Sequence, residues 1–168
     1  MPTAFAHLPT PIGELLLTAS DSALTGVLFP GPVPPVREPE GGEDDGSGPA
    51  GALLARAREQ LTEYFAGTRT TFDLPLEAAG SLFERRVWGA LRTIPYGTTV
   101  SYSELARRLG DVRATRAVGA ANGKNPIPII VPCHRVVGAH GELTGFGGGL
   151  DRKRWLLEHE GALMKLGG

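Results

Sequence analysis

The sequence predicts an α+β fold in two parts, a small N-terminal α/β domain over residues 1–80 and a mostly helical C-terminal domain over residues 81–168. Three observations predict it. Near the N-terminus, apolar residues alternate or cluster in short runs, as they do in strands. Beyond residue 81 they recur every three or four positions, which is the spacing of helices. Between the strand-like runs and the first helix, residues 30–50 are rich in proline, glycine and acidic residues, which predicts a mobile surface loop.

The first domain is expected to contain an antiparallel sheet of three strands and one helix. Short turn sequences join the three strand-like runs, which favours an antiparallel arrangement. After the loop, apolar residues recur at helical spacing from Leu53 to Tyr64, and Gly67 lies where a helix C-cap belongs. Thr70–Leu76 is expected to be extended. The predicted strands are Ala4–Leu8, Gly13–Ala19 and Ala23–Phe29.

The second domain is predicted from its helix start and stop signals. Capping-box patterns at Ser81–Glu84 and Ser101–Glu104 each begin a helix, and Ile94–Gly97 breaks the first of the two. A tight turn with glycine separates the second helix from another, Arg113–Asn122. Two short helices joined in this way resemble a helix-turn-helix. The last predicted helix is Leu150–Glu160.

Charge is unevenly distributed along the chain. The formal net charge is −1 and the pI is about 6.4. Residues 1–80 carry four basic and eleven acidic side chains, whereas residues 81–168 carry thirteen basic and seven acidic ones. Phosphate binding needs local positive charge, so the second domain is compatible with a nucleic-acid partner. Uneven charge is also common in proteins that bind no nucleic acid, so this asymmetry alone does not decide the function.

A single cysteine, Cys133, limits the structural chemistry of the chain. It excludes an intramolecular disulfide, which suits a reducing cytosol. Together with the four histidines it matches no zinc spacing, so we expect no metal site, and no organic cofactor is implied. The N-terminus has no signal-peptide pattern, and no apolar run approaches the ~20 residues that span a bilayer. We therefore expect a cytoplasmic protein without a membrane partner (nuclear if its source is eukaryotic).

Residues 125–137 are the most informative segment for chemistry. An apolar run flanked by prolines is stiff and is expected to be buried, and it leads to Cys133, His134 and Arg135. Burial alone raises the pKa of a thiol and makes it inert. A neighbouring imidazole, or a helical turn that starts after Pro132, lowers the cost of forming the thiolate. The alternative for Cys133 is an inert cysteine in the core. For Arg135 we favour a structural role over a contact with phosphate.

Six segments within residues 81–161 carry a family resemblance. They are Ile94-Pro-Tyr-Gly-Thr-Thr-Val-Ser-Tyr102, Arg116-Ala-Val-Gly-Ala120, Asn125-Pro126, Pro132-Cys-His-Arg-Val136, Gly145-Phe-Gly-Gly-Gly149 and Trp155-Leu-Leu-Glu-His-Glu-Gly161. In order and approximate spacing they are similar to the O6-alkylguanine-DNA alkyltransferases, also called methylated-DNA–protein-cysteine methyltransferases. Residues 1–80 look like the variable first domain of that family. Taken together, the segments make the resemblance specific.

The resemblance implies direct-reversal DNA repair. The alkyl group of O6-methylguanine, and by extension that of O4-methylthymine, would pass irreversibly to Cys133 in a single turnover. The buried sulfur of Cys133 would be held ready to become an anion beside an imidazole. His134 would take the thiol proton through a water, with Glu160 holding the imidazole and Asn125 orienting the network. Tyr102 would donate to the purine as it leaves and would crowd the 3′ phosphate. The plain alternatives are a solvated helix-end acid for Glu160 and an Asn-Pro turn for Asn125.

The resemblance also implies that the damaged base is turned out of the DNA duplex. Arg116 would enter the base stack through the minor groove, from a helix that small residues keep slim. Tight packing against a neighbouring helix is the alternative reason for those small residues. Family members often have tyrosine at Phe146 and serine at Gly147, so two contacts of the lesion pocket differ here. The other implied residues are Ala114, Thr115, Gly119, Ala120, Arg113 and again Tyr102 for DNA, and Val136 and Pro128 for the base pocket.

Three other functions are the alternatives, and a feature of the sequence argues against each. An alkyltransferase-like protein that binds alkylated DNA without reacting would lack the nucleophile, and a helix-turn-helix regulator would need neither Cys133 nor Glu160. In a cysteine–histidine hydrolase the two side chains would not be sequence neighbours, because neighbouring side chains diverge. As partner we expect double-stranded DNA that contains O6-alkylguanine. The protein is expected to be a monomer that could cluster on DNA, at the nucleoid when engaged.

Overall fold

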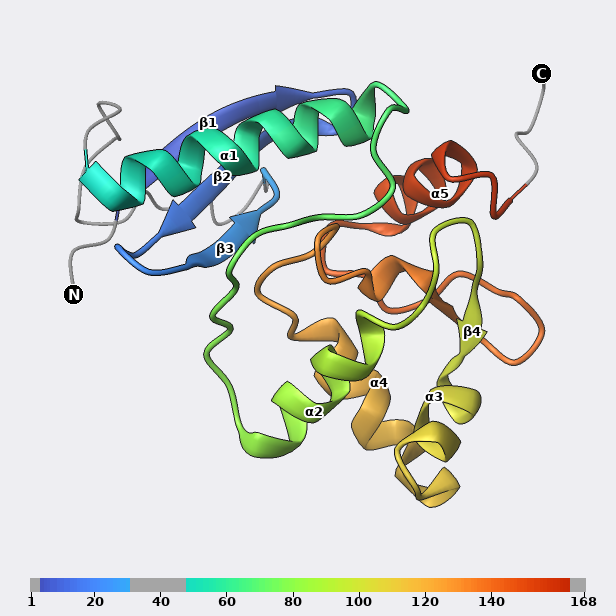
Figure 1. Ribbon diagram of the computed structural model, residues 1–168. Coiled ribbons are helices and arrows are strands. Elements are labelled where there is room, and N and C mark those ends of the chain that lie inside the picture. The colour runs from blue at the N-terminus through green and yellow to red at the C-terminus, as the bar shows by residue number, and fades with distance from the viewer. Residues whose placement is uncertain (1–3, 31–47, 164–168) are drawn as a thin grey trace. The chain divides into compact units, whose positions relative to one another are not determined.

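The computed structural model describes residues 4–30 and 48–163 (Figure 1). The chain divides into two compact units, Met1–Ala79 and Gly80–Gly168. Most of the loop predicted over residues 30–50 lies outside the described residues. Among the described helices, none is both long enough and apolar enough to cross a membrane.

A three-stranded antiparallel sheet forms the first unit, as the sequence predicts. Its strands are β1 (Ala4–Thr10), β2 (Gly13–Ala19) and β3 (Leu24–Leu28), in the order β1-β2-β3. β1 runs on through Pro9, which the sequence assigns to a turn, because an edge strand tolerates a residue that cannot donate to the ladder. The extended segment predicted to end at Leu76 lies along β3, where Leu24 N donates to Pro75 O at 2.9 Å.

The helix of the first unit, α1 (Gly48–Phe65), begins earlier than the sequence predicts and lies across the sheet (Figure 1). The loop was expected to extend to residue 50, but Ala50 already belongs to the buried face of the helix. Packing of this face outweighs the loop-like composition of the first turn. Gly67 ends the helix as predicted. It adopts φ +82, Gly67 N donates to Tyr64 O at 3.0 Å and Thr68 N donates to Glu63 O at 2.9 Å, which is the Schellman pattern.

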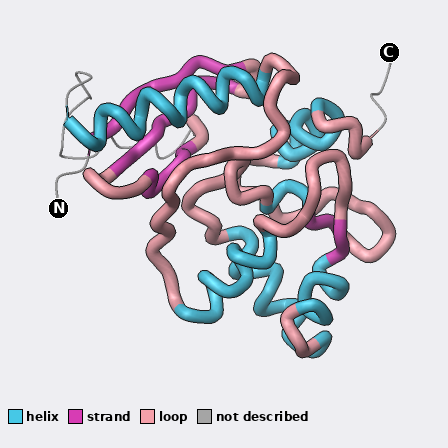
Figure 2. The backbone as a smooth tube through the Cα atoms, viewed as in Figure 1, coloured by secondary structure: helices cyan, strands magenta, loops and turns pink. Residues whose placement is uncertain are grey.

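Helices make up most of the regular structure of the second unit (Figure 2). The capping box at its start is confirmed, because Ser81 Oγ accepts from Glu84 N at 3.1 Å and the Glu84 carboxylate accepts from Ser81 N at 2.9 Å. The helix predicted from Arg113 starts instead as a 3-10 turn, η1 (Val112–Ala114), which the Asp111 side chain caps. The α-helices are α2 (Leu82–Leu91), α3 (Tyr102–Arg108), α4 (Thr115–Gly123) and α5 (Leu150–His159).

Helices α3 and α4 pack against each other with η1 between them. Ser101 Oγ accepts from Glu104 N at 3.0 Å, which is one half of the capping box predicted there. The Glu104 carboxylate binds Arg107 and Arg108 on the exposed side of α3. That α3 and α4 work as a helix-turn-helix stays a prediction.

A short parallel ladder, which no signal in the sequence predicted, positions the segment that contains Cys133. β4 (Val100–Ser101) pairs with β5 (Val136–Val137). β5 directly follows the 3-10 turn η2 (Cys133–Arg135), and Tyr102 directly follows β4. The ladder therefore brings Tyr102 close to the Cys-His-Arg turn. Trp88 Nε1 donates to Ala121 O at 2.8 Å and so connects α2 to α4.

Candidate active site

The segment before Cys133 is buried, as predicted, and Asn125 hydrogen-bonds its backbone. Ile127, Ile129 and Val131 all have little exposed surface. Asn125 braces the turn, because its Nδ2 donates to Val131 O at 2.8 Å and its Oδ1 accepts from Ile127 N at 3.0 Å. Ile129 has φ +73, a left-handed conformation that is costly for a β-branched residue. The turn-forming alternative for Asn125 is therefore present, and its amide also reaches the thiol of Cys133.

Cys133 begins η2, and only 4% of its surface is exposed. Burial raises the pKa of its thiol to about 11, although the Asn125 amide and the Lys153 ammonium act in the opposite direction. The backbone N–H of Cys133 also lowers this pKa, but its effect is smaller than that of burial, and the same N–H donates to Val131 O at 2.8 Å. The resting thiol is therefore protonated. The expectation of a sulfur held ready to become an anion is wrong, and a base must remove the proton.

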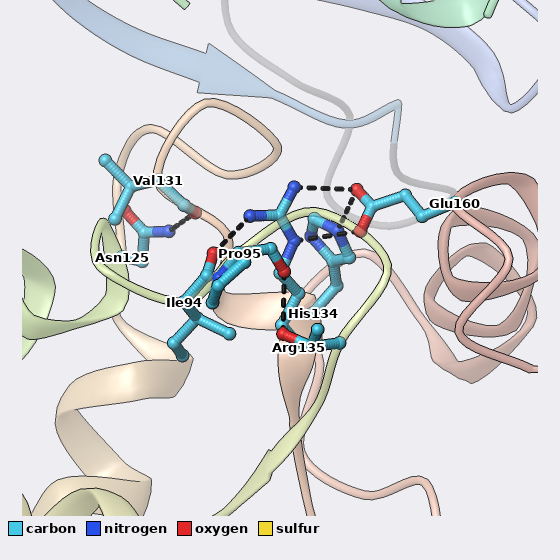
Figure 3. Close-up of polar contacts among 8 residues, drawn as sticks. Ile94, Pro95, Asn125, Val131, His134, Arg135 and Glu160 are labelled. Atoms are coloured by element: carbon cyan, nitrogen blue, oxygen red, sulfur yellow. Dashed lines mark hydrogen bonds and ion pairs between the residues drawn. The ribbon is translucent and has the colours of Figure 1, made fainter. Parts of the chain in front are cut away.

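His134 and Glu160 form a buried pair (Figure 3). His134 Nε2 lies 2.8 Å from Glu160 Oε2, and neither side chain is exposed. Burial opposes ionisation of Glu160, but the hydrogen bonds and charges of His134 and Arg135 outweigh it and lower the pKa of this carboxyl to about 2. Burial lowers the pKa of His134, against the opposing effect of Glu160. At neutral pH the carboxyl group is therefore ionised and the imidazole is neutral.

The ionised carboxylate decides which nitrogen of His134 carries the proton. A carboxylate can only accept hydrogen bonds, so Nε2 must donate to Glu160. The lone pair of the neutral ring is then on Nδ1. This atom is buried and has no hydrogen-bond partner within residues 4–30 and 48–163. We infer that Nδ1 is the basic nitrogen of the site.

Arg135 binds the same carboxylate. Its Nε donates to Glu160 Oε1 at 2.8 Å, its Nη2 to Glu160 Oε2 at 3.1 Å and its Nη1 to Ile94 O at 2.6 Å. In Figure 3 the guanidinium lies between the Ile94 carbonyl and Glu160. Because Arg135 balances the buried negative charge, His134 can remain neutral. Arg135 is thus a structural residue, as the sequence favours, but its pairing with Glu160 was not predicted.

Tyr102 lies where α4 approaches the loop of residues 145–149. Its hydroxyl donates to Thr144 O at 3.0 Å. A Cβ atom built on Gly119 of α4 would lie 3.7 Å from the Tyr102 ring, and one built on Gly145 would lie 3.2 Å from the hydroxyl oxygen. Gly145 also has φ +61, so both its conformation and its surroundings favour glycine. Burial raises the pKa of Tyr102, so the hydroxyl keeps its proton at neutral pH.

The residues predicted to line a base pocket differ in exposure. Val136 and Pro128 are buried, Phe146 is half-buried and Gly147 is exposed. Gly147 lies beside the end of α4, because a Cβ atom built on it would be 3.8 Å from Gly123 O. The Val136 carbonyl accepts from Lys153 Nζ at 2.6 Å.

The residues predicted to meet DNA lie on η1 and α4. Arg113, Arg116 and Ala120 are exposed and are spaced three and four positions apart, so the two on α4 share a face. Of the others, Ala114, Thr115 and Gly119 are half-buried. The buried face of α4 is bound to the Cys133 turn, because Asn122 Nδ2 donates to Cys133 O at 3.3 Å.

Sequence reasoning missed Asn122 and Lys153. Lys153 is a charged residue without exposed surface, in α5. Its position carried a signal, since residues 153, 156, 157 and 160 follow the helical spacing of one face and all are buried. A lysine on the apolar face of a predicted helix indicates an ammonium group that is buried. For Asn122 the sequence offers no comparable signal, because an asparagine near a helix end is ordinarily exposed.

A single thiol next to an imidazole that a carboxylate orients is the arrangement used by proteins with a nucleophilic cysteine. Residues 4–78 match the model of the 6-O-methylguanine DNA methyltransferase ribonuclease-like domain, and residues 82–162 match that of the DNA binding domain of the same proteins. The chain belongs to the 6-O-methylguanine DNA methyltransferase family. Within the described residues, no group of three or more His, Cys, Asp or Glu side chains could hold a metal ion.

Individual relatives match over nearly the whole chain. A methylated-DNA–protein-cysteine methyltransferase of Mycolicibacterium paratuberculosis is 52% identical over 158 residues, which cover 93% of this chain and 91% of the relative. One of Methanosarcina acetivorans is 42% identical and covers 94% of this chain and 98% of the relative. The crystal structure of Mycobacterium tuberculosis OGT in complex with DNA superposes with a TM-score of 0.84 at 46% identity, covering 95% of this chain and 93% of that one.

Proposed function

We propose that this protein repairs alkylated DNA by direct reversal, moving the alkyl group of O6-methylguanine to its own Cys133 in one irreversible turnover. The observation that carries the proposal is His134 Nδ1, a buried basic nitrogen in the residue next to the chain's one cysteine, oriented by Glu160. Membership of the family and the names of the relatives support it. The acceptor is a protein side chain, so the reaction needs no cofactor, and the stable thioether leaves the protein spent.

The reaction is an in-line displacement at the alkyl carbon. The Cys133 thiol gives its proton to His134 Nδ1 through a bridging water, and Glu160 stabilises the imidazolium that forms. The sulfur–carbon bond forms as the bond between carbon and guanine O6 breaks, and the electron pair of the broken bond stays on the purine. The proton then reaches guanine N1, which restores guanine and neutral His134. Because the pKa of the resting thiol is about 11, the proton transfer to His134 contributes to the barrier.

Tyr102 stabilises the purine while it gains electron density. Its protonated hydroxyl can donate to the ring of the leaving base, and a donor aimed at developing charge lowers the barrier more than it strengthens substrate binding. Asn125 holds the turn before Cys133 and so keeps the thiol in position for the reaction. The flipped base would lie against Val136, Pro128, Phe146 and Gly147.

Double-stranded DNA is the proposed partner, and η1 and α4 carry the contact surface. Arg116 would fill the gap in the base stack, while its small neighbours allow close approach to the minor groove. Those neighbours are Ala114, Thr115, Gly119 and Ala120, with Arg113 and Tyr102 close to the phosphates. We propose that the protein acts as a monomer in the cytoplasm, at the nucleoid when it is engaged on DNA.

A lesion-binding protein that does not react is not favoured. Such a protein would have no use for a thiol, whereas this chain has Cys133 braced by Asn125 and a basic nitrogen on the next residue. The curated relatives at about half identity are named as methyltransferases.

Intact-protein and peptide mass spectrometry after incubation with a duplex that contains O6-methylguanine tests the proposed function. We expect one added methyl group, located on Cys133, and unmodified guanine in the recovered DNA. A parallel duplex with O4-methylthymine measures the range of lesions. Recovery of unmodified protein together with an intact lesion, under conditions where the complex forms, would refute the transfer and favour a silent binder.

Arg116→Ala is expected to slow repair of duplex DNA by about tenfold or more. Without the arginine, no side chain would fill the gap that the flipped base leaves in the base stack, so the flipped state would be less stable. Reaction with free O6-benzylguanine should be unchanged, because that substrate needs no flipping. Single-turnover rates on both substrates check this. Arg154→Ala, which removes an exposed arginine from α5, is the matched control for loss of charge. Equal losses on the two substrates would show that Arg116 supports the fold or the chemistry and not base flipping.

A further inference from the structure

Lys153 is a fully buried lysine in the second unit, and the mechanism above does not use it. Its Nζ donates to Val136 O and to Thr144 O, each at 2.6 Å. Placing an ammonium group out of contact with water is costly unless strong acceptors surround it. Two short hydrogen bonds to backbone carbonyls supply part of that compensation, and a third donor of the group is left over.

The two carbonyls belong to different segments of the proposed site. Val136 follows the Cys-His-Arg turn and pairs with Val100 in the parallel ladder. Thr144 precedes Gly145 and the loop that the proposed function places over the base. The ammonium therefore joins the turn that carries the thiol to the start of that loop.

The Thr144 carbonyl is shared by two donors. It accepts from Lys153 Nζ at 2.6 Å and from the Tyr102 hydroxyl at 3.0 Å, and Nζ lies 5.8 Å from the centroid of the Tyr102 ring. In this state the hydroxyl proton of Tyr102 is occupied and cannot point to a purine. If the hydroxyl turns away, Lys153 still satisfies the carbonyl, so no acceptor is left without a partner. The shared acceptor thus lets Tyr102 change partner at low cost.

The charge of Lys153 acts on groups from two neighbouring elements. Cys133 and His134 on η2 both feel it, in that it favours the thiolate and disfavours the imidazolium. Tyr102 of α3 presents its ring and hydroxyl. The carboxylate of Glu160 is bound by His134 and Arg135. Burial lowers the pKa of Lys153 to about 8, with Cys133 acting in the opposite direction, so the ammonium can lose its charge within the working range of pH.

We propose that Lys153 is a positioning residue for alkyl transfer, whose ammonium holds the Val136 and Thr144 carbonyls together, releases the Tyr102 hydroxyl to the purine and favours the developing thiolate of Cys133. This inference rests on the proposed function. In the transfer step the thiol proton goes to His134, so the site as a whole neither gains nor loses a proton before the reaction. Lys153 acts in this step through its positive charge. Loss of the Lys153 proton at high pH should therefore slow the reaction.

Single-turnover rates of wild type, Lys153→Met and Lys153→Arg test the inference, on the O6-methylguanine duplex and on free O6-benzylguanine, from about pH 6.5 to about pH 9.5. Lys153→Met should lower the rate constant on the order of 100-fold on both substrates, as expected for loss of one preorganised donor. Its affinity for the duplex, measured with Cys133→Ala also present, should change less than about threefold, because Lys153 is too buried to meet phosphate. Arg154→Met removes an exposed charge from the same helix and should react like wild type.

The pH profile separates positioning by a charged group from a purely structural role. The wild-type rate should fall above pH 8 or so, whereas Lys153→Met should stay low without this break. Lys153→Arg should recover part of the rate and keep it above that pH, because a guanidinium stays charged. Circular dichroism shows whether each variant folds. If Lys153→Met or Lys153→Arg does not fold, the rates of the variant that does fold test the role of Lys153. If wild type transfers the alkyl group but has no break, or if Lys153→Met reacts at the wild-type rate, the role of Lys153 is refuted. If wild type itself transfers nothing, the proposed function fails instead.

Discussion

Cys133→Ala is expected to abolish alkyl transfer completely while leaving the protein folded and able to bind the lesion. The chain has no second cysteine, and a hydroxyl or amine elsewhere could not replace a thiol in line with the alkyl carbon. The small side chain also removes a buried thiol that makes no structural disulfide, so the cost in stability is modest. Loss of O6-methylguanine from the duplex, followed by nuclease digestion and chromatography, measures the residual activity.

Cys133→Ser is the matched variant, because it keeps the size of the side chain and replaces the sulfur by a much less acidic hydroxyl. It should be as inactive as Cys133→Ala. Both variants should hold the duplex with the affinity of wild type before reaction. Transfer by either variant, with the methyl group found on another residue, would contradict the assignment of the acceptor.

Glu160→Gln is expected to have the next largest effect, a loss in transfer rate on the order of 10²- to 10⁴-fold, as when the carboxylate of a nucleophile–base–carboxylate group is replaced by its amide. The amide cannot stabilise the imidazolium as a carboxylate does. Its NH₂ group can also donate to His134 Nε2, which would place the proton on Nδ1 and remove the proposed base. Single-turnover kinetics at neutral pH measure this loss.

The same substitution should lower the free energy of unfolding by about 3–5 kcal/mol, because Arg135 would keep its buried charge without a partner. Urea denaturation measures the change. Glu158→Gln, two positions earlier in α5, is the control: Glu158 pairs with Arg154 only at 4.0 Å, and its loss should change stability by less than about 1 kcal/mol. If Glu158→Gln and Glu160→Gln cost the same, the ion pair of Glu160 is not a major stabilising contact.

The pH dependence of stability follows from the lowered pKa of Glu160. The folded-state pKa of about 2 is below the ordinary value of 4.5, so this contribution is complete above pH 4.5 and is lost as the pH falls towards 2. The lowered pKa of His134 acts in the same direction, because the unfolded chain binds a proton near pH 6.5 that the folded chain refuses. Wild type should therefore lose stability on acidification, and Glu160→Gln should lose less over the same range.

Local signals in the sequence predicted the parts of the fold that depend on neighbouring residues. The reciprocal bonds of Ser81 and Glu84 and the left-handed Gly67 are examples, since each needs only the few residues around it. The start of α1 was missed, because its first turn has the composition of a loop and becomes helical through packing. The expected readiness of Cys133 to ionise was also wrong, because the effect of burial on the thiol pKa outweighs that of the groups favouring the thiolate, and this balance depends on the tertiary fold.

The candidate site was predicted where a resemblance supplied the partners and missed where only packing does. Glu160 and His134 were expected together, and their atoms lie 2.8 Å apart. Arg135 as a second partner of Glu160, Asn122 on the Cys133 carbonyl and the inward-facing Lys153 were not, because each contact joins elements whose relative placement the sequence does not state.

The left-handed conformation of Ile129 indicates that the turn before Cys133 becomes ordered when the protein folds, not when it binds DNA. A β-branched residue keeps a positive φ only where its surroundings leave no other choice, and here the side chain is buried while Asn125 bonds the backbone on both sides of it. The strain is therefore borne when the chain folds, before any DNA arrives. A damaged base then meets a rigid sulfur, and little motional freedom remains to be lost at that moment.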